Sequence, residues 1–180
     1  GEVRHAIGRA EADPAVVGII ITGAGRAFCA GADMGNLTAL TEGGPLDEAP
    51  VELAIEPDPD RPADFAGEYT YLLATSKPII AAINGAALGG GCFMAISCDL
   101  CVAAESASFA LTEARVGRAP IYAFWLNGMI PQKVALEMSM TGNPITARRA
   151  YELGLVNHVV PAAQLMEKAL ALAMDLCAAA

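Results

Sequence analysis

Residues 78–91 of this 180-residue chain read PIIAAINGAALGGG, an apolar run followed by an Asn-Gly pair and then three glycines. The length and isoleucine content of the run are typical of a strand buried on both faces of a parallel sheet. The glycines are typical of a turn into a helix, where a ligand can approach the backbone closely. This stretch therefore predicts a strand–turn–helix unit of an α/β fold, with a possible ligand site at the strand end.

Residues 16–33, VVGIIITGAGRAFCAGAD, repeat this organisation. The β-branched run predicts another strand buried on both faces, and the glycines predict a turn. Two backbone N–H groups from such turns can converge on one oxygen and form an oxyanion hole. Each turn taken alone could equally be a plain connection. Neither is a dinucleotide or P-loop motif, because Gly23-x-Gly25 lacks the third glycine and no Gly-Lys-Ser/Thr follows.

The rest of the chain alternates the two kinds of pattern. We expect helices over 3–11, 33–40, 63–75, 89–97, 122–140 with an interruption at Pro131, 147–153 and 163–180, and strands over 16–21, 78–83, 100–103, 108–110 and 156–160. This alternation predicts a mainly parallel sheet covered on both faces. Residues 41–62 are acidic, rich in proline and too long for a plain connector, so they predict a mobile loop, either an active-site flap or an insertion.

Composition and charge favour one globular domain over residues 1–180. More than half of the residues are apolar, only 17% are charged, and the net charge is −9. An acidic chain is a poor partner for nucleic acid. No apolar run reaches the roughly 18 residues of a membrane span, and Glu2, Arg4 and His5 do not resemble a signal peptide. We therefore expect no membrane partner and a cytoplasmic protein.

The five cysteines are odd in number and irregularly spaced, which argues against a disulfide framework and favours a reducing compartment. Cys98 and Cys101 form a CxxC pair. This pair could be a redox or metal motif, or two small buried residues beside a strand. We favour the second interpretation and expect no metal site, because there is no second CxxC and there are only two histidines.

Four segments, in order, resemble the signatures of the enoyl-CoA hydratase/isomerase (crotonase) superfamily. They are GRAFCAGAD at 25–33, KPIIAAINGAALGGGC at 77–92, FALTEARVG at 109–117, and TGNPITA at 141–147 with GLVNHVVP at 154–161. The resemblance implies a crotonase-like (ClpP/crotonase) α/β spiral of ββα-type units. It also implies proton transfer on an acyl-CoA thioester through an enolate, in fatty acid metabolism. The CoA thioester would be the substrate, and no separate cofactor is expected.

The resemblance also implies site residues. The thioester oxygen would accept hydrogen bonds from the N–H groups of Ala32 and Gly90, each donor contributing about 3–4 kcal/mol in the transition state. Glu113 falls on one of the two glutamates that hydratases of this family use for proton transfer, although a glutamate in a loop is otherwise often just solvated. The surrounding substrate-binding residues would be Gly31, Asp33, Gly89, Gly91, Phe93 and Pro120.

The chain departs from the family pattern at two places inside the domain. Phe93 stands where the family has its other glutamate, so one carboxylate remains, which suits isomerisation at least as well as hydration. After Pro120, a stretch that is often rich in glycine instead contains large apolar side chains. These are Tyr122, Phe124, Trp125 and Met129, which could line an acyl-chain pocket or pack in the core.

Other polar residues receive simpler interpretations. We expect Asp99 to be a structural turn residue, Lys77 to be a solvated or phosphate-side cation, and His158 to be a core or rim residue. If Glu113 were not the base, Asp33 and His158 would be the next candidates.

The resemblance implies that the family's N-terminal strand and C-terminal helices are missing or shortened, so that the fold is truncated at both ends. It also implies a homotrimer or a dimer of trimers, which would cover part of the apolar surface. Two other functions stay open. One is a different enolate reaction, such as decarboxylation or retro-aldol cleavage, and the other is a non-catalytic CoA-binding subunit.

Overall fold

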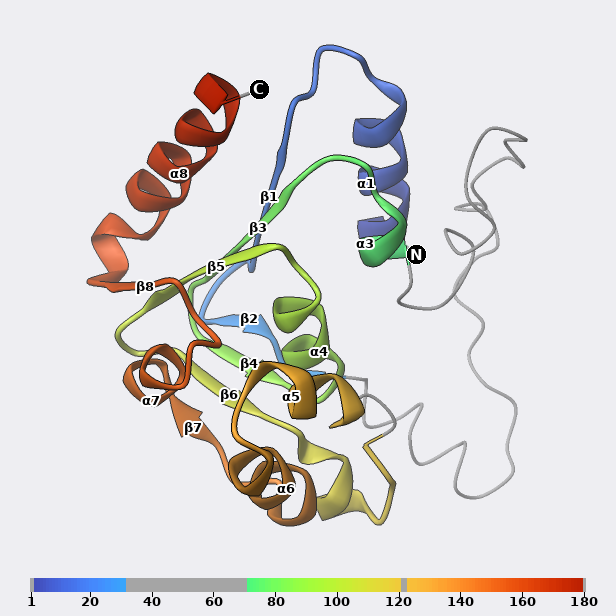
Figure 1. Cartoon of the computed structure of the whole chain (residues 1–180), viewed down its shortest axis with the longest axis vertical. Helices are drawn as coiled ribbons and strands as arrows, with labels where there is room; N and C mark the ends of the chain where they lie inside the picture. Colours follow the sequence, from blue (N-terminus) through green and yellow to red (C-terminus); the bar gives the residue numbers. More distant parts are fainter. Residues whose placement is uncertain (1, 32–70, 121–122, 180) are drawn as a thin grey trace.

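The computed structural model describes residues 2–31, 71–120 and 123–179 (Figure 1). The helix predicted at 33–40, the loop predicted at 41–62 and most of the helix predicted at 63–75 lie outside these ranges. The described elements, in chain order, are α1 (Glu2–Ala12), β1 (Ile19–Thr22), β2 (Ala27–Cys29), α3 (Tyr71–Ala74), β3 (Ile79–Ile83), β4 (Ala86–Leu88), α4 (Gly90–Ile96), β5 (Leu100–Ala104), β6 (Ser108–Ala110), the 3₁₀ helix η3 (Thr112–Val116), α5 (Ala123–Met129), α6 (Gln132–Thr141), β7 (Ile145–Thr146), α7 (Ala147–Glu152), β8 (His158–Val160), η4 (Ala162–Gln164) and α8 (Leu165–Ala179).

The described strands form two four-stranded sheets, whereas the sequence predicted one. The first sheet has the order β1-β3-β5-β8 and is parallel throughout. In the second sheet, β2, β4 and β6 are parallel and β7 is antiparallel. Short turns at 23–26, 84–85 and 105–107 carry the chain from the first sheet to the second. The strands thus form three consecutive pairs, β1–β2, β3–β4 and β5–β6. The second pair is followed by α4 and the third by η3, which confirms the expected spiral of ββα-type units.

The second sheet was missed because its strands are very short. β2 and β4 have three residues each, and β7 has two. Such segments contain too few residues to show the alternation of apolar and polar side chains that identifies a strand. The interruption expected at Pro131 is confirmed, since α5 ends at Met129 and Pro131 is the N-cap of α6.

The central strand β3 is buried at every position and presents its side chains to two different helical layers. Ile80 and Ala82 belong to a cluster with Leu165 and Ala169 of α8. Ile79 instead belongs to a cluster with residues of α1 and α3. In Figure 1, α8 lies on one side of β1, β3 and β5, and α1 and α3 lie on the other. The first sheet is therefore covered on both faces, as predicted.

β1 differs from its prediction as a strand buried on both faces. Its residues are half-buried or exposed, and the preceding Val17 is 48% exposed. Among the described strands, β1 pairs only with β3. β1 is therefore an edge strand of the described sheet, and its β-branched composition did not reveal this position.

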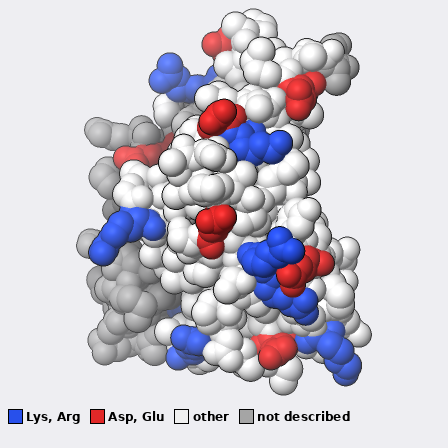
Figure 2. Space-filling model, turned by 90° about the vertical axis from the view of Figure 1, so that its left-hand side faces the viewer, with Lys and Arg blue, Asp and Glu red and all other residues white. Residues whose placement is uncertain are grey.

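Figure 2 shows the side of the molecule that lies to the left in Figure 1. On this face, acidic and basic side chains are interspersed, and much of the surface between them is uncharged. The face therefore offers no continuous basic track of the kind that phosphate backbones require. No helix within the described ranges is long and apolar enough to cross a membrane.

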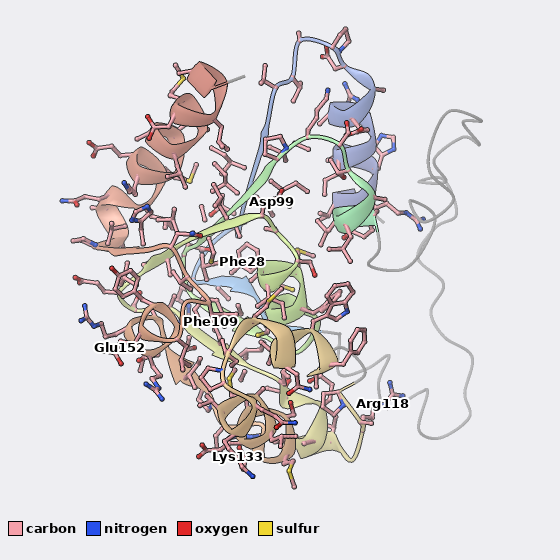
Figure 3. The ribbon with its side chains drawn as sticks, in the orientation of Figure 1. Phe28, Asp99, Phe109, Arg118, Lys133 and Glu152 are labelled. Atoms are coloured by element: carbon pink, nitrogen blue, oxygen red, sulfur yellow. The ribbon has the colours of Figure 1, made fainter. Side chains whose placement is uncertain are left out.

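Glycine permits close approaches between the two glycine-bearing units that the sequence predicted, residues 16–33 and 78–91. A β-carbon on Gly91, in the first turn of α4, would overlap the carbonyl oxygen of Cys29 and lie 2.6 Å from the β-carbon of Cys29. Likewise, a β-carbon on Gly85 would overlap the carbonyl oxygen of Arg26. Phe28 and Phe109, from β2 and β6, fill the interior beside these contacts (Figure 3). Glycine at positions 85 and 91 thus allows residues 84–91 to lie close to residues 26–29.

We predict that Gly91→Ala lowers the free energy of unfolding by about 1–3 kcal/mol, the usual cost of overpacking. Gly128 is a matched control, because it also lies in a short helix but a β-carbon there would meet nothing within 4 Å. Gly128→Ala should raise stability by about 0.5–1 kcal/mol, since alanine favours the helix. Urea unfolding of the three proteins measures both effects, and equal stability of the two variants would contradict the packing.

Candidate active site

The carboxyl ends of β2, β4 and β6 lie at one edge of the second sheet. The parallel registers pair Cys29 with Ala87 and Leu88 with Ala110. Three chain segments therefore leave the sheet next to one another: the end of β2 with Gly31, the start of α4, and the start of η3 with Glu113. Such an edge is where ligands bind in parallel α/β sheets.

Glycines shape this edge and bring two of the predicted segments into contact. Gly31 has a φ of 93°, and a β-carbon on it would lie 3.1 Å from the carbonyl oxygen of Leu88. Gly89 has a φ of 53°, is the N-cap of α4, and donates its N–H to the carbonyl oxygen of Ala110 over 2.8 Å. L-residues with side chains rarely adopt these positive φ values. The structure thus places Gly31 against Leu88, the residue before Gly89, and the substrate-binding role of the two glycines stays a prediction.

Gly90 is the first residue of α4, where N–H groups have no partner within the helix. Its proposed role as an oxyanion-hole donor fits this position. The proposed second donor, Ala32, and the substrate-binding residue Asp33 lie outside the described residues. The interpretation of these two residues stays a prediction.

Glu113 lies on η3 with its carboxylate turned toward the beginning of α4. A β-carbon on Gly89 would lie 3.3 Å from Oε1 of Glu113 and 3.1 Å from Oγ1 of Thr112. The other carboxylate oxygen, Oε2, is buried and accepts no hydrogen bond from any residue in the described ranges. Buried polar atoms normally have partners, and a catalytic role is one of the explanations for an exception. Glu113 is therefore not simply a solvated loop residue.

Cys92, to which the sequence assigned no role, lies in the first turn of α4 and is fully buried. Burial raises the pKa of its thiol to about 12, with a further increase from the negative charge of Glu113 and a smaller opposing effect from the backbone of Ala110. The thiol is therefore neutral at physiological pH, so Cys92 is a poor nucleophile. Its place in the apolar core beside a carboxylate could not be inferred from the sequence.

Two predicted substrate-binding residues lie near this region without a contact that defines their role. Phe93 is only 2% exposed and belongs to the core cluster that includes Leu126 and Ile130. Pro120 is half-buried, and its carbonyl oxygen accepts the N–H of Ala123 over 2.9 Å. Their contact with a substrate stays a prediction.

Three of the large apolar residues of α5 do not pack in the core, contrary to one of the two interpretations above. Phe124 is 62% exposed, Trp125 36% and Met129 43%. Trp125 and Met129 line a cavity of about 270 Å³ with Leu73 and residues 96–99. This cavity adjoins the C-terminal end of α4, whereas the glycine run begins that helix. Whether these residues contact an acyl chain stays a prediction.

The remaining polar residues have structural partners or lie elsewhere. Oδ2 of Asp99 accepts the N–H of Ile79 over 2.7 Å, so Asp99 is structural, as predicted. Lys77 is half-buried and has partners that the sequence did not predict, since its Nζ donates to the carbonyl oxygens of Ala10 and Asp13 at the end of α1. His158 lies on β8, in the other sheet, and burial and the nearby Lys168 lower its pKa.

Cys98 and Cys101 are free cysteines beside and within β5. Burial raises the pKa of both thiols, that of Cys98 to about 12. The part of the chain that the structure describes contains no group of three His, Cys, Asp or Glu side chains that could hold a metal ion. Cys101 is buried and Cys98 is half-buried, so Cys101 alone fully matches the interpretation as small buried residues beside a strand.

Comparisons with known proteins agree with this architecture. The family model for enoyl-CoA hydratase/isomerase matches residues 1–180. The carnitinyl-CoA dehydratase of Proteus mirabilis is 42% identical over 164 residues, which cover 89% of this chain and 58% of that protein. The mitochondrial enoyl-CoA hydratase of Pongo abelii is 34% identical over 171 residues, covering 94% of this chain and 54% of that protein.

A solved structure of an enoyl-CoA hydratase subunit from Geobacillus kaustophilus matches with a TM-score of 0.79 and 35% identity. That match covers 97% of this chain and 63% of the other. The chain thus spans less than two thirds of the length of the relatives it matches. The match to the family model over the whole chain, together with the similarity of fold, shows that this chain belongs to the enoyl-CoA hydratase/isomerase family.

Proposed function

We propose that the protein transfers protons on an acyl-CoA thioester through an enolate, in the manner of a hydratase or isomerase. One observation supports this proposal most strongly. Glu113 has a buried carboxylate oxygen without a hydrogen bond from the described residues, and its other oxygen lies against Gly89 at the start of α4. A proton acceptor therefore lies beside the start of α4, whose first residue, Gly90, carries the proposed backbone donor.

The proposed mechanism assigns each group one task. The thioester oxygen accepts a hydrogen bond from the N–H of Gly90 and, by resemblance, from that of Ala32. Glu113 removes a proton from the substrate carbon, and the electron pair of the C–H bond moves into the carbonyl, giving an enolate. The backbone donors stabilise the negative charge on oxygen, and Glu113 returns the proton to a carbon of the same substrate.

A single carboxylate suits isomerisation, since one group can move one proton between two carbons. Hydration and dehydration are the second candidate, supported by the names of the relatives, one a hydratase and the other a carnitinyl-CoA dehydratase. In that case Glu113 would have to orient water and also deliver the proton, because Phe93 can do neither. The two candidates share the enolate. In isomerisation and dehydration it forms by removal of a proton from carbon, whereas in hydration it forms by addition of water to the double bond.

We predict that Glu113→Gln lowers kcat by roughly 10²–10⁴-fold, the usual contribution of one general acid–base group, while substrate binding changes much less. Glutamine keeps the size of the side chain but cannot exchange the proton. The rate is measured by ultraviolet absorbance with a panel of enoyl-CoA thioesters, and by loss of the α-proton signal of an acyl-CoA in D₂O.

Glu137→Gln is the control for this experiment, because Glu137 is exposed on α6 and its side chain has no assigned role. This variant should keep the parent rate. An unchanged rate in Glu113→Gln would contradict the assignment of the base. If the parent binds CoA thioesters but turns over none of the panel, the chain is a binding subunit and the proposed activity is wrong.

We also predict that Gly90→Pro abolishes turnover, because proline removes the backbone donor from the oxyanion hole. A proline at the first position of a helix is well tolerated, so the fold should persist. Far-ultraviolet circular dichroism checks the fold, and the thioester assay checks the activity. A folded variant with a parent-like rate would show that the Gly90 N–H does not bind the reacting oxygen.

Phe93→Glu tests the consequence of the missing carboxylate. If Phe93 occupies the place of the second acid, this variant should gain hydration of a short enoyl-CoA relative to the parent. We expect the gain to be small and accompanied by a lower Tm, since position 93 is buried and an unpaired carboxylate there is costly. Phe93→Leu, which stays apolar, should show no gain, and equal hydration by both variants would contradict the interpretation.

A further inference from the structure

Glu113 lies in a segment that the protein core does not hold directly. The 3₁₀ helix η3 has only five residues, and none of them is buried. A proton-transfer group must nevertheless be placed accurately, because a misplacement of about 1 Å can cost roughly 10²-fold in rate. Contacts outside the core must therefore fix the conformation of η3.

The first of these contacts is made by Gly142, which ends α6. Gly142 is buried, has a φ of 64°, and donates its N–H to the carbonyl oxygen of Met138. A β-carbon on Gly142 would lie 3.1 Å from the carbonyl oxygen of Leu111 and 3.0 Å from Cγ of Arg115. The end of α6 thus touches the chain two residues before Glu113 and two residues after it.

The second contact is a hydrogen bond between side chains. Nη2 of Arg115 donates to Oδ1 of Asn143 over 2.8 Å, joining residues 28 positions apart. The Asn143 backbone is itself held, since its N–H donates to Oγ1 of Thr141 over 3.1 Å. Oγ1 of Thr141 in turn donates to the carbonyl oxygen of Glu137, one turn back in α6. The acceptor for Arg115 is therefore anchored to a regular helix.

The other bonds of η3 are local and act on the same short segment. The N–H of Arg118 donates to the carbonyl oxygen of Glu113 over 3.0 Å, and Gly117 ends the helix with a φ of 69°. Neither feature relates η3 to the rest of the domain. Within the described part of the chain, the Arg115–Asn143 bond is the side-chain hydrogen bond that does so.

We propose that Arg115 and Asn143 are positioning residues that hold the Glu113 carboxylate against the start of α4. This proposal rests on the proton-transfer role proposed for Glu113. The bond is exposed to solvent, so water replaces it when it is lost and global stability changes little. Its loss lets η3 move, and the effect falls on the chemical step rather than on substrate binding.

The experiment compares Arg115→Ala, Asn143→Ala and the double variant by kcat, KM and Tm. Each single variant should lower kcat by about tenfold, consistent with a small displacement of the base, while KM changes by less than about threefold. The double variant should be no slower than the slower single variant, because both remove the same bond. Arg115→Lys, which keeps a donor, should recover part of the loss.

Arg148→Ala is the matched control, since it also removes an exposed arginine with one side-chain hydrogen bond, here to Glu152 on α7. It should leave kcat unchanged. A raised KM with parent kcat in Arg115→Ala would overturn the proposal, because Arg115 would then bind substrate instead. Additive losses in the double variant would also overturn it.

Combining Arg115→Ala with Glu113→Gln separates this proposal from the proposed function. Once glutamine at position 113 can no longer exchange a proton, misplacing this side chain should matter little, so kcat should fall by less than about twofold further. A further tenfold loss would show that Arg115 does not act through the carboxylate. If Glu113→Gln slows the reaction but Arg115→Ala and Asn143→Ala do not, only the positioning role is wrong. If Glu113→Gln has no effect, the proposed function fails as well.

Discussion

The close approach of α4 to the end of β2 is the constraint on which the rest of the site depends. It requires glycine at position 91, since a side chain there would overlap the Cys29 backbone. With this contact in place, the parallel registers of β2, β4 and β6 bring their carboxyl ends to one edge. The start of α4 then lies beside the carboxylate of Glu113, on the 3₁₀ helix η3 that follows β6. Contacts between backbone segments thus determine where the proposed site lies.

Among the described residues, the proposed site combines a backbone donor, that of Gly90, with the carboxylate of Glu113. Cys92 stays neutral beside Glu113, and Phe93 is buried in the core cluster, so neither supplies a second acid or base. In the proposed mechanism, acid–base work therefore falls on one group, whose placement matters more than it would in a pair. The proposed positioning role of the contacts from the end of α6 to Leu111 and Arg115 accounts for how a partly exposed five-residue 3₁₀ helix holds that group in place.

The sequence predicted individual strands and helices better than their arrangement into sheets and their burial. The strand at 78–83, the helix opened by Gly89 to Gly91 and the break at Pro131 were all identifiable from local patterns. The second sheet was missed because β2, β4 and β7 are too short to show a period. The edge position of β1 and the exposure of Phe124 were missed because burial depends on neighbours distant in the sequence. Glu113 was proposed as the proton-transfer residue from the family resemblance. The hydrogen bond from Arg115 to Asn143 joins residues 28 positions apart, and no sequence pattern predicts it.

A structure of the protein with a bound acyl-CoA thioester tests the central claim most directly. The account predicts the thioester oxygen within hydrogen-bonding distance, about 3 Å, of the Gly90 nitrogen. It also predicts the Glu113 carboxylate beside the carbon that exchanges its proton. A thioester oxygen bound far from Gly90, or a reactive carbon out of reach of Glu113, would contradict it.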